Sequence, residues 1–534
     1  MLLPFSANVV PVPTRGLMRF KLFRNGLSDR SERSVAVDAG QLWHQRLLKS
    51  FWVGLGIFSV FILLVARPES VEGFVGAMMI MAAALLPAYL WCSGRAHGLP
   101  VFPIFALSYT WTYALPLLVA RKEVTVYSPR SQFLASVIVT AFLALSTFIW
   151  FAFVRRLKAP PRACRVLGGE TNLFFLSSIV ASAFYTMGMV GGWLDSVGSI
   201  IGVLRGVIFG VSALATYVLA YKWGRKELSR RTVMIFGISL AVYVIASAAT
   251  LLIVGAFSIA VLAIIGYVVG RKRVPWFTIT VAFACLIMLH SGKHIMRDKY
   301  WAPGGSATVQ PWQYPNWFAE WLSYSAENLS QSDEDEPESG PASFYDRVSL
   351  IHLLLLAQES TSIDTPYLYG ATYAVIPELL VPRVFSPDKL STTEGTNLIN
   401  VHFGLQERED TERTTIGWGL LNEAYVNFGV IGCMALAIII GWFYGYMTRW
   451  SMNTPVLSAR TLFAALLISF ACQTEFSASV YITSLFQSTV PLLLISLVLM
   501  RTRRLDREHA TPLSTDSPQL NDRLLGPNSA ATLT

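Results

Sequence analysis

Residues 132–154 read QFLASVIVTAFLALSTFIWFAFV, a run without a charged side chain that is followed at once by Arg155, Arg156 and Lys158. A helix of roughly 20 apolar residues spans a hydrocarbon core of about 30 Å. The run therefore predicts a transmembrane helix. Its basic flank predicts the cytoplasmic end, because Lys and Arg beside a span stay inside during insertion.

Similar runs recur along the chain. Of its 534 residues, 53% are hydrophobic and 14% are charged, and the mean hydropathy is +0.49, a balance typical of proteins that dissolve in lipid. We predict an all-α polytopic bundle of about twelve transmembrane helices, within a range of roughly ten to thirteen. The predicted spans are 51–66, 72–92, 100–120, 132–154, 172–194, 197–221, 232–252, 254–270, 274–291, 424–447, 459–475 and 481–500.

The distribution of Lys and Arg predicts the orientation. With the N-terminus inside, alternate loops are basic, although Arg121, Lys122 and Arg130 would then lie outside. Both termini are predicted to be cytoplasmic. The predicted regions are a basic cytoplasmic tail at 1–50, nine helices at 51–291, a large extracytoplasmic loop at 292–416, three helices at 417–500 and a cytoplasmic tail at 501–534.

The large loop differs in charge from the rest of the chain. Acidic residues outnumber Lys and Arg by 18 to 8 within 292–416, whereas the whole chain carries a net charge of +9. The basic charge therefore sets topology at the cytoplasmic face, and nucleic-acid binding is not predicted.

The same loop divides into four pieces. Residues 292–324 are rich in Trp and Tyr, which either line the membrane interface or stack on sugars. Residues 325–342 are acidic and predict a flexible linker. Residues 343–382 regain helical character and are expected to lie along or dip into the membrane. Residues 383–416 are polar and rich in turns, which favours a functional loop.

Cationic side chains near the outer face predict a diphosphate site. Arg205 lies within the sixth predicted span, where a charge is costly and suggests function. Guanidinium groups bind phosphate in a bidentate manner. The alternative for Arg205 is that its side chain snorkels to the membrane interface. For each of the other candidates it is a surface ion pair. The predicted diphosphate ligands are Arg205, Lys293, Arg297, Arg347, Arg383 and Lys389.

The tenth predicted span begins with unusually polar residues. Asn422, Glu423 and Tyr425 lie where an apolar helix starts. Glu423 is either a first-turn carboxylate stabilised by the helix dipole or a general base. His402 is a second candidate base, because its ordinary pKa is near neutrality. Neither a metal site nor a cofactor is predicted, since the sequence has no cluster of ligand residues.

Several short motifs carry a resemblance to a known family. They are Tyr369-Gly370 with Tyr373, Ile376-Pro377, Pro382-Arg383 with Pro387-Asp388-Lys389, and Asn422-Glu423-x-Tyr425-x-Asn427-Phe428-Gly429-x-x-Gly432. With the topology, they resemble bacterial O-antigen and exopolysaccharide repeat-unit polymerases, and distantly the O-antigen ligases. The ligase relatives carry a histidine before the Asn, whereas Leu421 precedes Asn422 here.

The resemblance implies a GT-C-like, metal-independent glycosyltransferase in the bacterial inner membrane. It would join undecaprenyl-diphosphate-linked repeat units at the periplasmic face, with Glu423 or His402 as the base. Tyr369, Tyr373, Asn422 and Tyr425 would bind the glycan. The implied partners are lipid-linked glycans and membrane lipids, with a chain-length regulator and a flippase. A lipid-linked oligosaccharide flippase and an O-antigen ligase stay as alternatives.

Overall fold

The fold is all-α apart from one two-stranded sheet. The computed structural model describes residues 42–120, 122–169, 171–194, 200–301, 308–330, 349–361, 365–381, 386, 389–412 and 415–505. Within these ranges, ten helices are long and apolar enough to cross a membrane. They are Leu42–Val65, α2 (Val71–Cys92), α3 to α4 (Val101–Leu118), α6 (Pro129–Val154), α7 (Asn172–Val190), α8 (Ile200–Gly224), α9 (Arg230–Ala249), α10 (Ile253–Arg271), α18 (Gly419–Ser451) and α20 (Ala478–Val498).

The other two predicted spans are helical but shorter. They are α11 (Trp276–Ser291) and α19 (Ala459–Ala471). The first helix begins at Leu42, whereas the sequence predicts its span from residue 51 and a tail before it. The all-α class is thus confirmed, and ten of the predicted spans have the length of a transmembrane helix.

Exposed apolar side chains show that lipid surrounds the bundle. Leu63 is 80% exposed, Phe277 is 84% exposed and Ile431 is 81% exposed. Exposure of so many large apolar side chains to water would cost much free energy. The chain is therefore a multi-pass membrane protein.

Small residues allow the helices to pack closely. In α2, a Cβ placed on Gly76 would lie 2.3 Å from the Ser136 hydroxyl of α6, and in α18 a Cβ on Gly441 would lie 2.7 Å from the Ser146 carbonyl oxygen. The Ser146 hydroxyl also donates to the Ala437 carbonyl, at 3.0 Å. Close backbone approach is the usual way for helices to pack in lipid, where the hydrophobic effect does not drive them together.

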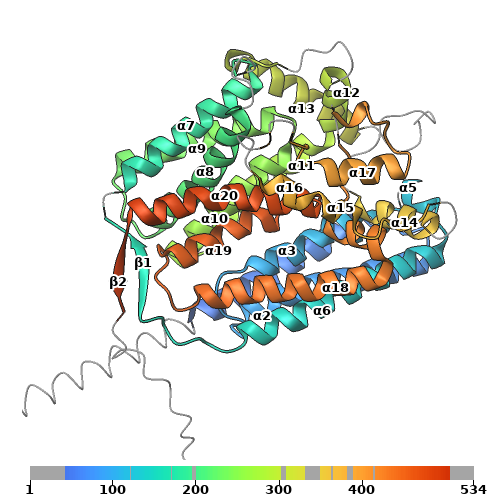
Figure 1. Ribbon diagram of the computed structural model, residues 1–534, viewed down its shortest axis with the longest axis horizontal. Coiled ribbons are helices and arrows are strands. Elements are labelled where there is room, and N and C mark those ends of the chain that lie inside the picture. The colour runs from blue at the N-terminus through green and yellow to red at the C-terminus, as the bar shows by residue number, and fades with distance from the viewer. Residues whose placement is uncertain are drawn as a thin grey trace, which may run out of the picture.

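The two ends of the bundle carry different elements (Figure 1). The long helices run side by side, the sheet of β1 (Ala163–Leu167) and β2 (Met500–Arg504) lies at one end, and α12, α14 and α17 lie toward the other. The basic strands and helices α12, α14 and α17 thus lie toward opposite ends of the bundle.

Several short helices lie within 292–416. The predicted helical character of 343–382 is met by α14, which packs against η1 (Thr110–Ala114), α6 and α18. Two thirds of the acidic linker, residues 331–342, and residues 382–385 around Arg383 lie outside the described residues. The elements of this segment are α12 (Lys293–Trp301), η3 (Pro311–Gln313), α13 (Tyr314–Ser330), α14 (Leu350–Ser360), α15 (Ala371–Ala374), α16 (Ile376–Leu380), α17 (Glu394–His402) and η4 (Asp410–Glu412).

The aromatic piece of the segment forms a small core. Trp317 and Trp321 are buried against Met296 and the ends of α9 and α10 that adjoin the turn between these helices. Trp312 differs, since 73% of it is exposed. Packing of α12 and α13 onto the bundle is therefore the main role of Trp317 and Trp321, and Trp312 has the most exposed ring among the described aromatic side chains of this piece.

Candidate functional site

Helix α18 is broken near its start. Phe428 (φ −141°, ψ 15°) and Gly429 (φ 61°, ψ −149°) leave the helical conformation. The Gly429 conformation is one that residues with a Cβ rarely adopt, and a Cβ there would also lie 2.9 Å from the Tyr367 hydroxyl. A short first half of α18, ending at Asn427, is thereby separated from the long second half.

Asn427 ties this break to the loop before α15. Its carbonyl oxygen accepts from the Tyr369 amide at 3.2 Å, and its Oδ1 accepts from the Gly370 amide at 2.8 Å. Its Nδ2 donates to the Thr372 hydroxyl at 2.9 Å. These bonds satisfy buried polar groups that the break leaves without helical partners.

Glu423 is fully buried beside the N-terminus of α20. Its Oε2 accepts from the Ala478 amide at 2.5 Å. The Thr372 hydroxyl adjoins the same carboxyl group, but Oε1 makes no hydrogen bond of ordinary geometry within the described residues. A carboxylate is favourable at a helix N-terminus. Glu423 caps α20, whereas the sequence predicts that it stabilises the first turn of the helix in which it lies.

Two of the predicted glycan ligands are also buried. Asn422 accepts from the Tyr113 hydroxyl at 3.1 Å and donates to the Leu350 carbonyl at 2.8 Å, so that it joins η1, α14 and α18. Tyr425 is 7% exposed. Both side chains therefore contribute to packing in this conformation.

The other two predicted glycan ligands lie nearer the surface. Tyr373 is half-buried and stacks on Phe428, with ring centroids 6.3 Å apart. Tyr369 is 75% exposed. Of the four, Tyr369 presents the most open ring to a sugar.

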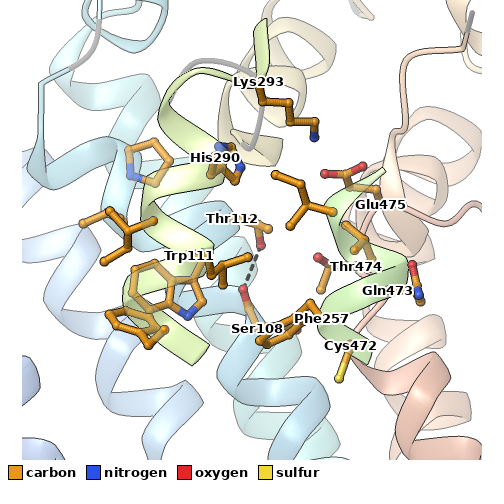
Figure 2. Close-up of a pocket in the computed structure, with 17 residues that line it drawn as sticks. Ser108, Trp111, Thr112, Phe257, His290, Lys293, Cys472, Gln473, Thr474 and Glu475 are labelled. Atoms are coloured by element: carbon orange, nitrogen blue, oxygen red, sulfur yellow. Dashed lines mark hydrogen bonds between the residues drawn. The ribbon is translucent and has the colours of Figure 1, made fainter. Parts of the chain in front are cut away.

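A cavity of about 290 Å³ lies between η1, α10, α11 and the turn from α19 to α20 (Figure 2). Lys293, His290 and Glu475 gather at one end of it, and Trp111 and Phe257 lie at the other. We call it the Lys293 cavity. Its lining residues are Ser108, Trp111, Thr112, Leu115, Pro116, Ile253, Val254, Phe257, Phe283, Leu286, Ile287, His290, Lys293, Cys472, Gln473, Thr474 and Glu475.

The α12–α13 hairpin positions Lys293, the first residue of α12. Lys299 donates to Glu320 Oε1 at 2.6 Å, and the Tyr300 hydroxyl donates to Oε2 at 2.8 Å. Partial burial acts to raise the pKa of Glu320, but these hydrogen bonds outweigh it and hold the pKa below its ordinary value. The carboxylate thus fixes α12 on α13.

The turn between α19 and α20 positions Glu475. Its carbonyl oxygen accepts from the Gly419 amide at 3.1 Å, at the start of α18. Gln473 of the same turn donates from Nε2 to the Ser258 hydroxyl of α10 at 2.9 Å. Since Ala478, three residues beyond Glu475, binds Glu423, one turn connects the buried carboxyl group with the cavity.

Of the predicted diphosphate ligands, Lys293 lines the cavity. Arg297 donates from Nη2 to the Leu251 carbonyl at 2.9 Å, in the turn between α9 and α10. The side chain of Arg205 on α8, and all of Arg347 and Arg383, lie outside the described residues.

Lys389 serves the end of a helix. Its ammonium group donates to the Leu379 carbonyl and, at 2.6 Å, to the Val381 carbonyl, both at the C-terminus of α16. A cation is favourable at the last carbonyls of a helix. Its role in diphosphate binding stays a prediction.

His402 contacts a backbone carbonyl. Its Nε2 lies 2.8 Å from the Pro366 oxygen. Because a carbonyl oxygen only accepts, Nε2 is the donor in this hydrogen bond. His402 stays a candidate base, on the loop side of the site.

The sequence analysis missed His290 and Glu475. Glu475 is a carboxylate at the end of the predicted span 459–475, and His290 ends the span 274–291. An ionisable residue at such a depth is a functional candidate, so a signal for both was present in the sequence.

No family model, curated protein or solved structure matches the chain.

Proposed function

We propose that the protein is a membrane glycosyltransferase that joins undecaprenyl-diphosphate-linked repeat units into O-antigen or exopolysaccharide at the periplasmic face of the bacterial inner membrane. The Lys293 cavity carries this proposal. It combines apolar walls with a cation, an imidazole and a carboxylate at one end. This arrangement suits a polyprenyl chain that ends in a charged headgroup.

The apolar walls account for the lipid carrier. Trp111 and Phe257 line the part of the cavity away from the charges, and the ring centroid of Phe283 lies 5.4 Å from that of Trp111. Burial of isoprenoid carbons against such side chains is favourable by about 25 cal/mol per Å². The walls thereby select a lipid-linked sugar over a soluble one.

The charged end accounts for group transfer. An acceptor hydroxyl oxygen attacks the anomeric carbon of the donor glycan, and the bond from that carbon to the diphosphate oxygen breaks. Its electron pair leaves with the undecaprenyl diphosphate, and Lys293 offsets the added negative charge. Glu475 accepts the hydroxyl proton as general base.

The buried Glu423 acts as a positioning residue. It has no exposed surface to meet a sugar, yet it holds the first amide of α20 and thereby the turn that carries Glu475. His402, at the end of α17, and Tyr369, in the loop before α15, are assigned to the acceptor glycan.

The test uses the full chain purified into lipid vesicles with lipid-linked repeat units. We expect longer glycans on the carrier and release of undecaprenyl diphosphate. In cells, deletion of the gene is expected to leave single repeat units on the carrier or on lipid A.

The alternatives give different products. If long chains persist after deletion and repeat units collect on the cytoplasmic face, the protein is a flippase. If polymer forms on the carrier but does not reach lipid A, it is a ligase.

A further inference from the structure

A second cavity, of about 600 Å³, lies between α8, α9 and α10. It is at the ends of these helices that the sequence predicts to be cytoplasmic. We call it the Arg271 cavity. Its lining residues are Trp223, Lys226, Leu228, Arg230, Val233, Met234, Tyr267 and Arg271.

The charges of this cavity are all positive. Lys226, Arg230 and Arg271 line it, and no carboxylate does. Within the described residues, none of the three forms an ion pair or a side-chain hydrogen bond. The neighbouring Arg225 differs, because it pairs with Glu227 at 3.2 Å. Three converging cations without an internal counter-ion favour an anionic ligand.

Close helix packing fixes the place of these cations. A Cβ on Gly270 of α10 would lie 2.4 Å from the Tyr221 carbonyl oxygen of α8, and one on Gly266 would lie 2.7 Å from the Tyr217 carbonyl oxygen. The Gly-x-x-x-Gly spacing thus allows backbone contact. Because Arg271 follows Gly270 directly, this contact brings it to the end of α8.

The turn after α8 directs Lys226 into the same space. Lys226 has a φ of 61°, in the left-handed region. Its amide donates to the Trp223 carbonyl and the Glu227 amide donates to the Lys222 carbonyl, both at 2.9 Å. These bonds cap α8 as in other helices that end with a left-handed residue.

An apolar surface continues from the cavity along α9. Met234 is 61% exposed and Ile238 is 59% exposed. Trp223, which is 42% exposed, lies with its ring centroid 4.9 Å from that of Tyr267. Aromatic rings beside a cationic cluster at the end of a membrane helix are typical of the headgroup region. A soluble anion would make no use of this apolar surface, whereas an acyl chain would.

We propose that the Arg271 cavity binds an anionic phospholipid of the cytoplasmic leaflet, with its phosphodiester group on Lys226, Arg230 and Arg271 and an acyl chain along Val233 and Met234. Basic pockets between membrane helices on this side commonly take such headgroups. The site is separate from the Lys293 cavity and does not depend on the proposed glycosyltransferase activity.

The test compares lipids bound to the intact chain by native mass spectrometry after extraction from two kinds of vesicle. One is phosphatidylcholine alone, and the other is phosphatidylcholine mixed with phosphatidylglycerol. We expect retained phosphatidylglycerol in preference to phosphatidylcholine. The variant Lys226→Gln/Arg230→Gln/Arg271→Gln is expected to lose at least about tenfold in its retention, because each basic residue near the surface contributes about fivefold.

A matched variant controls for total charge. Arg155→Gln/Arg156→Gln/Lys158→Gln removes the same charge from another loop that is predicted to be cytoplasmic, and it should retain phosphatidylglycerol as the unmodified chain does. The single variant Lys226→Arg keeps the positive charge and should also retain phosphatidylglycerol. This result would show that the charge of residue 226, and not a change in folding, determines retention.

Three results would overturn the proposal. The first is equal retention of both lipids by the unmodified chain. The second is an equal loss in the two triple variants. The third is displacement of phosphatidylglycerol by millimolar inorganic phosphate, which would assign the cavity to a soluble anion.

Discussion

The two cavities differ in whether an acidic or basic side chain lines them together with their cations. In the Lys293 cavity a carboxylate and an imidazole share the space with the ammonium group, whereas the Arg271 cavity has three cations and no acid. A mixed set can stabilise a leaving anion and also accept a proton. A purely cationic set can bind an anion but has no group that accepts a proton. This difference is why we propose catalysis for the Lys293 cavity and lipid binding for the Arg271 cavity.

The supports of the two cavities also differ. The Lys293 cavity depends on hydrogen bonds between elements that are distant in sequence, such as Glu423 with Ala478. The Arg271 cavity depends on backbone contact of α8 and α10 at Gly270. Substitutions can therefore damage one cavity and leave the other intact.

The largest effect is expected from Glu475→Gln. Loss of a general base lowers the rate by about 10²- to 10⁴-fold, and polymer formation in vesicles should fall accordingly with little change in lipid retention at the Arg271 cavity. Glu409→Gln, at an exposed loop carboxylate, is the matched control. If Glu475→Gln formed as much polymer as the unmodified chain, Glu475 would not be the general base.

The next effect is on stability, from Glu423→Ala. The change leaves the Ala478 amide without its acceptor and opens a space, at a cost of about 2–4 kcal/mol. Glu423→Gln keeps an oxygen acceptor and should cost about 1 kcal/mol or less. Denaturation midpoints of the purified variants measure both. Equal midpoints for the two variants would show that the bond to α20 contributes nothing.

Lys293→Gln is expected to act on the lipid-linked substrate. Loss of the cation beside the leaving diphosphate should lower kcat/KM by about 10- to 100-fold. Arg130→Gln removes the same charge from an exposed position and serves as the control. An unchanged kcat/KM for Lys293→Gln would place the diphosphate elsewhere.

Gly270→Ala should affect only the Arg271 cavity. Its Cβ would meet the Tyr221 carbonyl at 2.4 Å and push α8 from α10, at a cost of about 1–2 kcal/mol. We expect weaker retention of phosphatidylglycerol and an unchanged polymerisation rate in neutral lipid. Gly237→Ala is the control, because its Cβ would meet no atom within 4 Å. If Gly270→Ala retained as much phosphatidylglycerol as this control, the proposed packing would be contradicted.

The smallest expected effect is the loss of stability of the α12–α13 hairpin at acid pH. The folded-state pKa of Glu320 lies below its ordinary value, so its contribution to stability is complete above that value and is lost as the pH falls through the folded-state pKa. The α12–α13 hairpin should therefore loosen as the pH falls below the ordinary glutamate pKa of about 4.3. Hydrogen exchange of α12 measures this, and Glu320→Gln should remove the dependence; a dependence that persists would exclude Glu320 as its cause.

Much of the fold could be predicted because a single physical variable dominates it. Helix length in lipid follows from the apolar run, so that 132–154 and α6 agree closely. The break at Phe428 and Gly429 was not predicted, although both glycines of Gly429-Val430-Ile431-Gly432 were noted. A glycine in an apolar helix permits either close packing or a break, and the neighbouring loop decides between them.

The candidate site was predicted less well. Lys293 was chosen from its charge beside a span, and it lines the cavity. Glu423 and Asn422 were chosen as polar residues at the start of a helix, and both are buried in hydrogen bonds with other elements. Periodicity shows that a polar residue lies within a span, but it does not show whether that residue meets a ligand or another helix.

The sequence by itself determined that this chain dissolves in lipid, which stretches become helices and where positive charge collects, because these depend on local composition. The tertiary structure alone decided that Glu475 and Lys293 share a cavity, that Glu423 caps α20, and that Arg271 and Lys226 line one cavity. Those contacts join residues far apart in the chain, and their formation depends on which helices can approach closely.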